Sequence, residues 1–141
     1  MTETQYTILV VDDDPAGLEF LFEYLNRASF KVLVAVNAEA VRQSIRLERP
    51  DIILLDVKMP GIDGFDLAGQ LKKSAETEDI PIIFLTVLDD LASKIKAFER
   101  GAVDYITKPL QVEEVEARIH THLTIRDLQK SLREKNGSSL K

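Results

Sequence analysis

A run of four apolar residues, Ile52 to Leu55, leads directly into Asp56, and the chain turns soon afterwards at Pro60-Gly61. An apolar run this short, with turn residues close behind it, is typical of a β-strand that is buried on both faces. Strands of this kind belong to parallel sheets covered by helices on both sides. Asp56 then lies where the strand leaves the sheet, at the edge where open α/β sheets bind their ligands.

The rest of the chain repeats this pattern. Strands are predicted at residues 8–11, 32–36, 52–55, 82–85 and 105–107. Apolar residues at helical spacing predict helices after Pro15, from Asn37 to before Pro50, at about 65–73 and 89–100, and from Val112 to about Glu134. Strands that alternate with helices indicate a parallel sheet covered on both faces, and right-handed crossovers leave a doubly wound α/β domain as the natural fold.

Two details of these helices follow from residue type and spacing. Asp14 and Asn37 each stand just before a helix, and both are good N-cap residues. In the helix at 89–100, Leu91, Ile95 and Phe98 share one side, which we expect to pack against the sheet.

Composition excludes several classes of protein. The net charge of −6 argues against direct binding of nucleic acid, and the lack of cysteine excludes disulfides and thiolate chemistry. No stretch approaches the roughly 20 apolar residues of a membrane span. The first six residues lack the basic and apolar segments of a signal peptide, so we expect a cytoplasmic location.

Polar residues stand at the C-terminal end of four of the five predicted strands. They are Asp12, Asp13, Asp56, Thr86 and Lys108. Each of them alone could be a turn, cap or strand residue. Because the C-terminal ends of parallel strands lie at one edge of the sheet, however, the five together predict a functional site there.

Gathered carboxylates need positive charge. Two like charges about 4 Å apart repel by about 1 kcal/mol in water and by about 4 kcal/mol at an effective dielectric constant of 20. Lys108 supplies one cation, and an all-oxygen site that keeps several waters suits Mg²⁺, with Mn²⁺ as the other hard ion. Such a site neutralises an incoming phosphoryl group while a carboxylate attacks phosphorus, which gives an acyl phosphate.

The segments Val10–Asp14, Asp56–Gly61 and Tyr105–Pro109, together with Thr86, resemble the signatures of a response-regulator receiver domain. The resemblance is collinear over residues 6–121. It implies a flavodoxin-like five-stranded parallel sheet in the order 2-1-3-4-5 with five helices. The receiver domain is expected to span residues 1–123, and a C-terminal helical extension with a flexible tail is expected at residues 124–141.

By this resemblance, Asp56 accepts a phosphoryl group from the phosphohistidine of a sensor histidine kinase or a phosphotransfer protein. The resemblance also implies that Asp13 and Asp56 bind Mg²⁺ directly, that Asp12 binds it through water, and that the backbone carbonyl of Lys58 completes the protein ligands. The chain is then a phosphorylation-controlled switch, and it is not an enzyme that acts on a separate metabolite.

The resemblance assigns the remaining site residues to phosphate contact and switching. Thr86 hydrogen-bonds a phosphoryl oxygen, and Lys108 pairs with the phosphoryl group and is held by a cis bond to Pro109. When phosphate captures the Thr86 hydroxyl, space opens and the Tyr105 ring can turn inward. This movement reshapes the surface formed by the fourth helix, the fifth strand and the fifth helix. The other interpretation of Tyr105 is simply a strand-forming residue at a half-exposed position.

Two alternative functions share some of these residues. A haloacid-dehalogenase-type phosphatase would also use the acids at 12–14, Thr86 and Lys108, but it would need Thr or Val at Ala16, a late acidic pair and a substrate-capping insert. It would have no use for Asp56. A degenerate receiver that serves only as a docking module is the second alternative, although all five site residues are present.

The last helix carries two apolar stripes. Val112, Val115, Ile119 and Leu123 form the first stripe, and Ile125, Leu128 and Leu132 form the second, about 150° further round. One domain cannot bury both. The second stripe resembles a short coiled-coil seam, which suits a homodimer or a connection to an output domain, and a frayed terminal helix is the simpler interpretation. The surface of the fourth helix, fifth strand and fifth helix is another candidate for dimerisation.

His120 and His122 in the last helix are two residues apart, so their side chains face apart and are not a metal-binding pair.

Val87 departs from the family pattern, in which a small residue usually follows the threonine. Valine adds bulk at the mouth of the site. Lys58 and Leu88 beside it offer no carboxylate or amide that could orient a hydrolytic water. We therefore expect the phosphorylated state to be long-lived.

Replacement Val87→Ala should accelerate loss of phosphate from Asp56 several-fold, because donor and water then reach the site more easily. The decay of the phosphorylated protein after removal of the donor measures this rate. Rapid decay of the unsubstituted protein would contradict the expectation.

Overall fold

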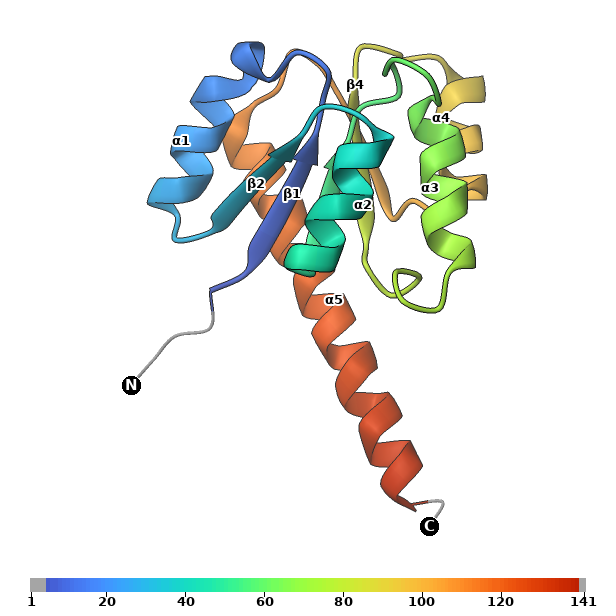
Figure 1. Ribbon diagram of the computed structural model, residues 1–141. Helices are drawn as coiled ribbons and strands as arrows, with labels where there is room; N and C mark the ends of the chain where they lie inside the picture. The colour runs from blue at the N-terminus through green and yellow to red at the C-terminus, as the bar shows by residue number, and fades with distance from the viewer. Residues whose placement is uncertain (1–4, 140–141) are drawn as a thin grey trace.

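Five short strands pair in parallel in the order β2-β1-β3-β4-β5, as the resemblance implies (Figure 1). The structure is a computed structural model that describes residues 5–139. The strands are β1 (Thr7–Val11), β2 (Lys31–Ala35), β3 (Ile52–Leu55), β4 (Ile82–Thr86) and β5 (Asp104–Thr107). Every residue of β1, β3 and β4 is buried, which confirms the prediction of strands covered on both faces. The edge strand β2 is partly exposed, at Lys31 and Val34.

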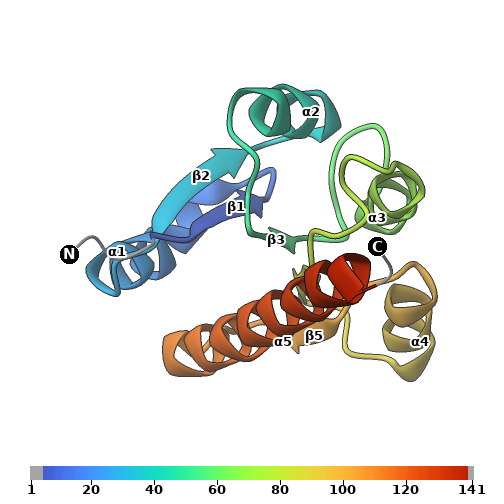
Figure 2. The ribbon, with the colours of Figure 1, turned by 90° about the horizontal axis from the view of Figure 1, so that it is seen from below.

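Helices cover both faces of the sheet, as Figure 2 shows from below. One face is covered by α2 (Ala38–Leu47), α3 (Gly64–Lys73) and α4 (Leu91–Glu99), and the other by α1 (Glu19–Arg27) and α5 (Val112–Ser139). Because side chains alternate along a strand, β3 gives Ile53 and Leu55 to the first layer and Ile52 and Leu54 to the second. The domain therefore has one apolar layer on each side of a central sheet.

The two predicted N-caps have different outcomes. The Asn37 side chain accepts a hydrogen bond from the Ala40 N–H at 2.8 Å, which confirms it as the cap of α2. Asp14 stands at the N-cap position of a 3₁₀ turn (η1, Pro15–Leu18) that precedes α1, and Pro15 opens this turn as predicted, but the Asp14 side chain makes no cap bond. The backbone of Asp14 (φ −130°, ψ 70°) lacks the extended conformation of Asn37 (φ −159°, ψ 174°), from which an N-cap side chain reaches back to the first turn.

The predicted orientation of α4 is also wrong. Leu91, Ile95 and Phe98 are 72%, 48% and 51% exposed, and the small side chain of Ala97 is the one that is buried. Periodicity shows that the three large residues share a side, but it does not show which way that side points. A row of apolar side chains on α4 is consequently open to solvent.

Helix α5 has both predicted stripes. Val115, Ile119 and Leu123 are buried in the second layer, and Val112 packs against it. Ile125, Leu128 and Leu132 are exposed on the part of α5 that extends below the sheet (Figure 1). The helix continues to Ser139 and so includes residues 136–139, whose composition predicts a flexible tail. Residues 1–4 and 140–141 lie outside the described part of the chain. Within residues 5–139, no helix is both long and apolar enough to cross a bilayer.

Candidate functional site

The backbone places three of the predicted site residues at one edge of the sheet. Parallel pairing continues one residue beyond each strand. The Asp12 N–H donates to the Ala35 carbonyl at 3.1 Å, and the Asp56 N–H donates to the Val11 carbonyl at 3.0 Å. The Lys108 N–H donates to the Thr86 carbonyl at 2.8 Å. Sheet pairing alone therefore brings residues almost a hundred positions apart to one edge.

Their side chains form a compact ionic cluster. The Lys108 ammonium donates to Asp12 Oδ2 at 2.9 Å and to Asp56 Oδ2 at 3.1 Å. The other oxygen of Asp56 lies 3.3 Å from the Lys58 N–H. Asp12 is buried, and the Asp56 side chain is 12% exposed. One cation thus bridges two carboxylates, and Asp56 keeps an opening to solvent. The peptide bond from Lys108 to Pro109 is cis, as the resemblance implies.

Burial and charge shift the pKa of both partners. Burial raises the pKa of Asp56, Lys108 opposes this shift, and the net pKa is above its ordinary value. For Lys108, burial works toward a lower pKa, but the hydrogen bonds to Asp12 and Asp56 outweigh it and the net pKa is raised. The lysine therefore stays cationic at neutral pH. A more basic carboxylate at Asp56 is also a better nucleophile.

A chain of hydrogen bonds joins Thr86 to Tyr105. The Thr86 hydroxyl is fully buried and accepts the Leu88 N–H at 3.3 Å. The Leu88 carbonyl accepts the Tyr105 hydroxyl at 2.6 Å. Burial, with the nearby charges of Asp90, Asp89 and Asp56, raises the pKa of Tyr105 to about 12, so the phenol remains a donor. Residue types along the sequence give no signal for the role of Leu88, because both of its contacts use the backbone.

Gly64 lets α3 approach the backbone of Asp56. The Gly64 N–H donates to the Val57 carbonyl at 2.7 Å. A Cβ at this position would collide with the backbone carbonyl oxygen of Asp56 and with Val57 Cα. The absence of a side chain here consequently fixes the path of the chain directly after the candidate nucleophile.

The donor set at this edge fits a hard divalent ion. Asp13 follows Asp12 and is exposed. Among residues 5–139 there is no group of three or more acidic, histidine or cysteine side chains placed to hold a metal. This does not conflict with magnesium, which usually takes one or two carboxylates and keeps several waters. The ligands that the resemblance predicts, which are the carboxylates of Asp13 and Asp56 and the Lys58 carbonyl, are oxygen donors of the kind that such an ion takes.

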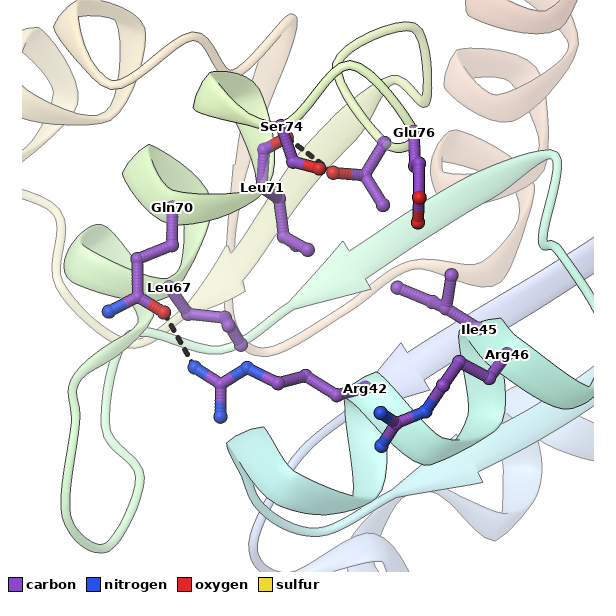
Figure 3. A pocket seen from close by; sticks show the side chains of 9 residues that line it. Arg42, Ile45, Arg46, Leu67, Gln70, Leu71, Ser74 and Glu76 are labelled. Carbon is purple, nitrogen blue, oxygen red and sulfur yellow. Dashed lines mark hydrogen bonds between the residues drawn. The ribbon is translucent and has the colours of Figure 1, made fainter.

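Two other features lie away from this edge. A cavity of about 250 Å³ between α2 and α3 has an apolar floor of Ile45, Leu67 and Leu71, and Arg42 donates to Gln70 across it at 2.6 Å (Figure 3). His122 lies 3.0 Å from Asp104 Oδ2 and His120 lies 3.5 Å from Glu116, so the two histidines face apart as predicted.

Comparison with known proteins gives a consistent result. A family model described as the response regulator receiver domain matches residues 8–120. The DNA-binding dual master transcriptional regulator RpaA of Synechocystis is 39% identical over 117 residues, or 82% of this chain and 48% of RpaA. Protein PilH of Pseudomonas aeruginosa is 41% identical over 106 residues, or 75% of this chain and 88% of PilH.

A solved structure extends the comparison to the fold. The BeF3-activated N-terminal receiver domain of Klebsiella pneumoniae RstA matches with a TM-score of 0.75 and 34% identity, over 83% of this chain and 97% of that one. The chain spans half or less of the length of the first curated relatives. The family match decides for a receiver over a dehalogenase-type phosphatase.

The raised pKa of Asp56 predicts an effect on stability. A carboxyl group whose pKa is higher in the folded protein favours folding when it is protonated, and this contribution is lost as the pH rises through the folded pKa. Asp56→Asn should therefore raise the urea midpoint at pH 7, and the gain should vanish near the ordinary aspartate pKa of about 3.9.

The matched control for this prediction is Asp51→Asn, the same change at the opposite end of β3. Asp51 accepts hydrogen bonds from the Thr7 N–H at 2.7 Å and from Arg126 at 3.0 Å, so this variant should lose stability. A lower urea midpoint for Asp56→Asn than for the unsubstituted protein at pH 7 would contradict the account.

Proposed function

This chain belongs to the family of response-regulator receiver domains, and we propose that it accepts a phosphoryl group on Asp56 and changes its surface in response. Receiver domains take phosphoryl groups from histidine kinases and act as signalling modules. The observation that carries the assignment is the Lys108 ammonium within 3.1 Å of both the Asp12 and Asp56 carboxylates, at a site open to solvent beside Asp56.

In the proposed reaction a carboxylate oxygen of Asp56 attacks phosphorus. The new O–P bond forms as the N–P bond to the donor's imidazole breaks, and the nitrogen keeps the electron pair. The Lys108 ammonium already lies 3.1 Å from the Asp56 carboxylate that reacts. It can therefore stay in contact with the negative charge when that charge moves onto the phosphoryl oxygens. The Thr86 hydroxyl is buried at the same edge and can donate to a phosphoryl oxygen, because it now serves only as an acceptor for the Leu88 N–H.

Receiver domains generally depend on Mg²⁺. Here the carboxylates of Asp13 and Asp56 and the backbone carbonyl of Lys58 would hold the ion, with Asp12 bound through water, and Mn²⁺ suits the same oxygen donors. When bound, the ion supplies positive charge against the phosphoryl oxygens and the gathered carboxylates.

The switch is proposed to run through the Leu88 backbone. Leu88 contacts the Thr86 hydroxyl through its N–H and the Tyr105 hydroxyl through its carbonyl. When the Thr86 hydroxyl binds a phosphoryl group, its hydrogen bond with the Leu88 N–H changes. The Leu88 carbonyl then shifts, and the Tyr105 hydroxyl bonded to it changes position. Tyr105 lies on β5 next to α4, whose apolar side chains are exposed, so the change reaches the surface of α4, β5 and α5.

We further propose a phosphohistidine-bearing protein as donor, a cytoplasmic location, and no turnover of a separate metabolite. This receiver would not bind nucleic acid itself, because its net charge is −6.

Incubation with acetyl phosphate and Mg²⁺ should add one phosphoryl group per chain, detected by intact-protein mass spectrometry and located at Asp56. Asp56→Asn should abolish the adduct, because an amide cannot attack. Asp51→Asn should retain it, because Asp51 lies at the far end of the same strand. Continuous release of phosphate that persists in Asp56→Asn would indicate a phosphatase, and no adduct on the unsubstituted protein would indicate a docking module.

The orientation of Tyr105 tests the switch. Beryllofluoride with Mg²⁺ should change the ring environment of Tyr105, followed by NMR of a sample labelled at tyrosine. In Thr86→Val, which keeps the shape but lacks the hydroxyl, the response should be lost even though the adduct still forms. An identical Tyr105 environment with and without the mimic in the unsubstituted protein would count against the mechanism.

A further inference from the structure

The cavity between α2 and α3 combines an apolar floor with a charged rim (Figure 3). Leu67 and Leu71 in the floor are buried in the first apolar layer, and Ile45 packs against that layer. Leu67 and Leu71 are one helical turn apart, about 6 Å along α3, so the floor is long enough for a short alkyl chain or one aromatic ring. Water over such a floor finds few hydrogen-bond partners, and an apolar group that displaces this water gains affinity.

Two arginine side chains line the α2 side of this cavity. Arg42 and Arg46 are four residues apart, so they lie on the same side of the helix. The ion pairs within residues 5–139 include neither of them. Arg42 donates instead to the neutral amide oxygen of Gln70 at 2.6 Å. Two positive charges therefore border an apolar cavity without a carboxylate in contact, in a chain whose net charge is −6.

The opposite side of the rim is polar and carries one negative charge. Gln70 belongs to α3, and Ser74 and Glu76 lie in the segment that leads from α3 to β4. The Gln70 amide nitrogen and the Ser74 hydroxyl can both donate hydrogen bonds. The buried Thr77 hydroxyl already donates to the Leu71 carbonyl at 2.5 Å. With two arginines against one glutamate, a ligand with a single negative charge leaves the rim neutral.

We propose that this cavity binds a small monocarboxylate with a short alkyl or aromatic body. The apolar body lies on the floor, and the carboxylate accepts hydrogen bonds from Arg42 and Arg46. Hydrogen bonds between a guanidinium and a carboxylate are roughly twice as strong as those between neutral groups, so the carboxylate displaces the Gln70 oxygen from Arg42. The Gln70 amide then turns its nitrogen toward the same carboxylate.

The size of the cavity sets the size of the ligand. Its volume of about 250 Å³ lies just below the range of roughly 300–1,000 Å³ that is usual for drug-sized ligands. A ligand small enough to fit buries little apolar surface, so we expect a dissociation constant of about 1 mM. The proposal does not depend on phosphorylation of Asp56, and the two can fail separately.

Titration with hexanoate tests the proposal, followed by NMR of the full chain labelled at the methyl groups of isoleucine and leucine. The signals of Ile45, Leu67 and Leu71 should shift and saturate with a dissociation constant of about 1 mM, while Leu25 in the second layer should not respond. Hexanol has the same chain without the charge and should bind about threefold more weakly or worse. Inorganic phosphate has charge without an apolar body and should leave the leucine signals unchanged.

Substitutions at the rim test the role of charge. The double variant Arg42→Gln with Arg46→Gln should bind hexanoate about threefold more weakly or worse and should bind hexanol like the unsubstituted protein. Gln70→Glu places a carboxylate beside Arg42 and should also weaken hexanoate binding. The matched control is Arg27→Gln, the same change at an exposed arginine at the end of α1, and it should leave binding unchanged. Because these side chains are all exposed, every variant should unfold at nearly the same temperature as the unsubstituted protein.

Three results would overturn the proposal. The first is the lack of a saturable shift of the floor methyl signals at hexanoate concentrations up to about 20 mM. The second is binding of hexanol or of inorganic phosphate at the same methyl groups as tightly as hexanoate, which would show an apolar site or an anion site alone. The third is equal binding of hexanoate by the unsubstituted protein, the double arginine variant and Gln70→Glu.

Discussion

Parallel pairing of β1 with β3 places two carboxylates side by side. The rest of the site offsets the repulsion between them. Val11 and Leu55 are partners in register, so Asp12 and Asp56 follow as neighbours at the edge of the sheet. Ionised carboxylates at about 4 Å cost about 4 kcal/mol at an effective dielectric of 20. The Lys108 ammonium, bonded to both, offsets this repulsion, and it is placed by the pairing of its own backbone with Thr86.

The same constraint acts on the pKa of the candidate nucleophile. Burial and the nearby Asp12 hold the pKa of Asp56 above its ordinary value, against the opposing effect of Lys108. The protein therefore keeps at Asp56 a carboxylate that is stabilised less well than it would be in water. The proposed divalent ion would relieve that condition, and together with Lys108 it would also offset the charge of a phosphoryl group. The cost in stability and the capacity to react have a single physical origin.

Much of this arrangement could be predicted from the sequence, because short apolar runs that end in polar residues determine both the strands and the edge. Asp12, Asp56 and Lys108 were predictable as neighbours for this reason. The direction of α4 was not, because Leu91, Ile95 and Phe98 have the spacing of a buried side and face solvent. Asp14 makes no cap bond because its backbone is not extended there, which residue type does not determine. The link through Leu88 uses backbone atoms that carry no residue-specific signal.

The central claim is that the ionic cluster around Asp56 receives the phosphoryl group. A crystal structure of the protein grown with beryllofluoride and Mg²⁺ tests it most directly. The account predicts a beryllium bonded to a carboxylate oxygen of Asp56, with the Lys108 ammonium and the Thr86 hydroxyl in contact with its fluorides. An adduct at another carboxylate, or Lys108 still bridging Asp12 and Asp56 in a crystal whose Asp56 carries no beryllium, would contradict it.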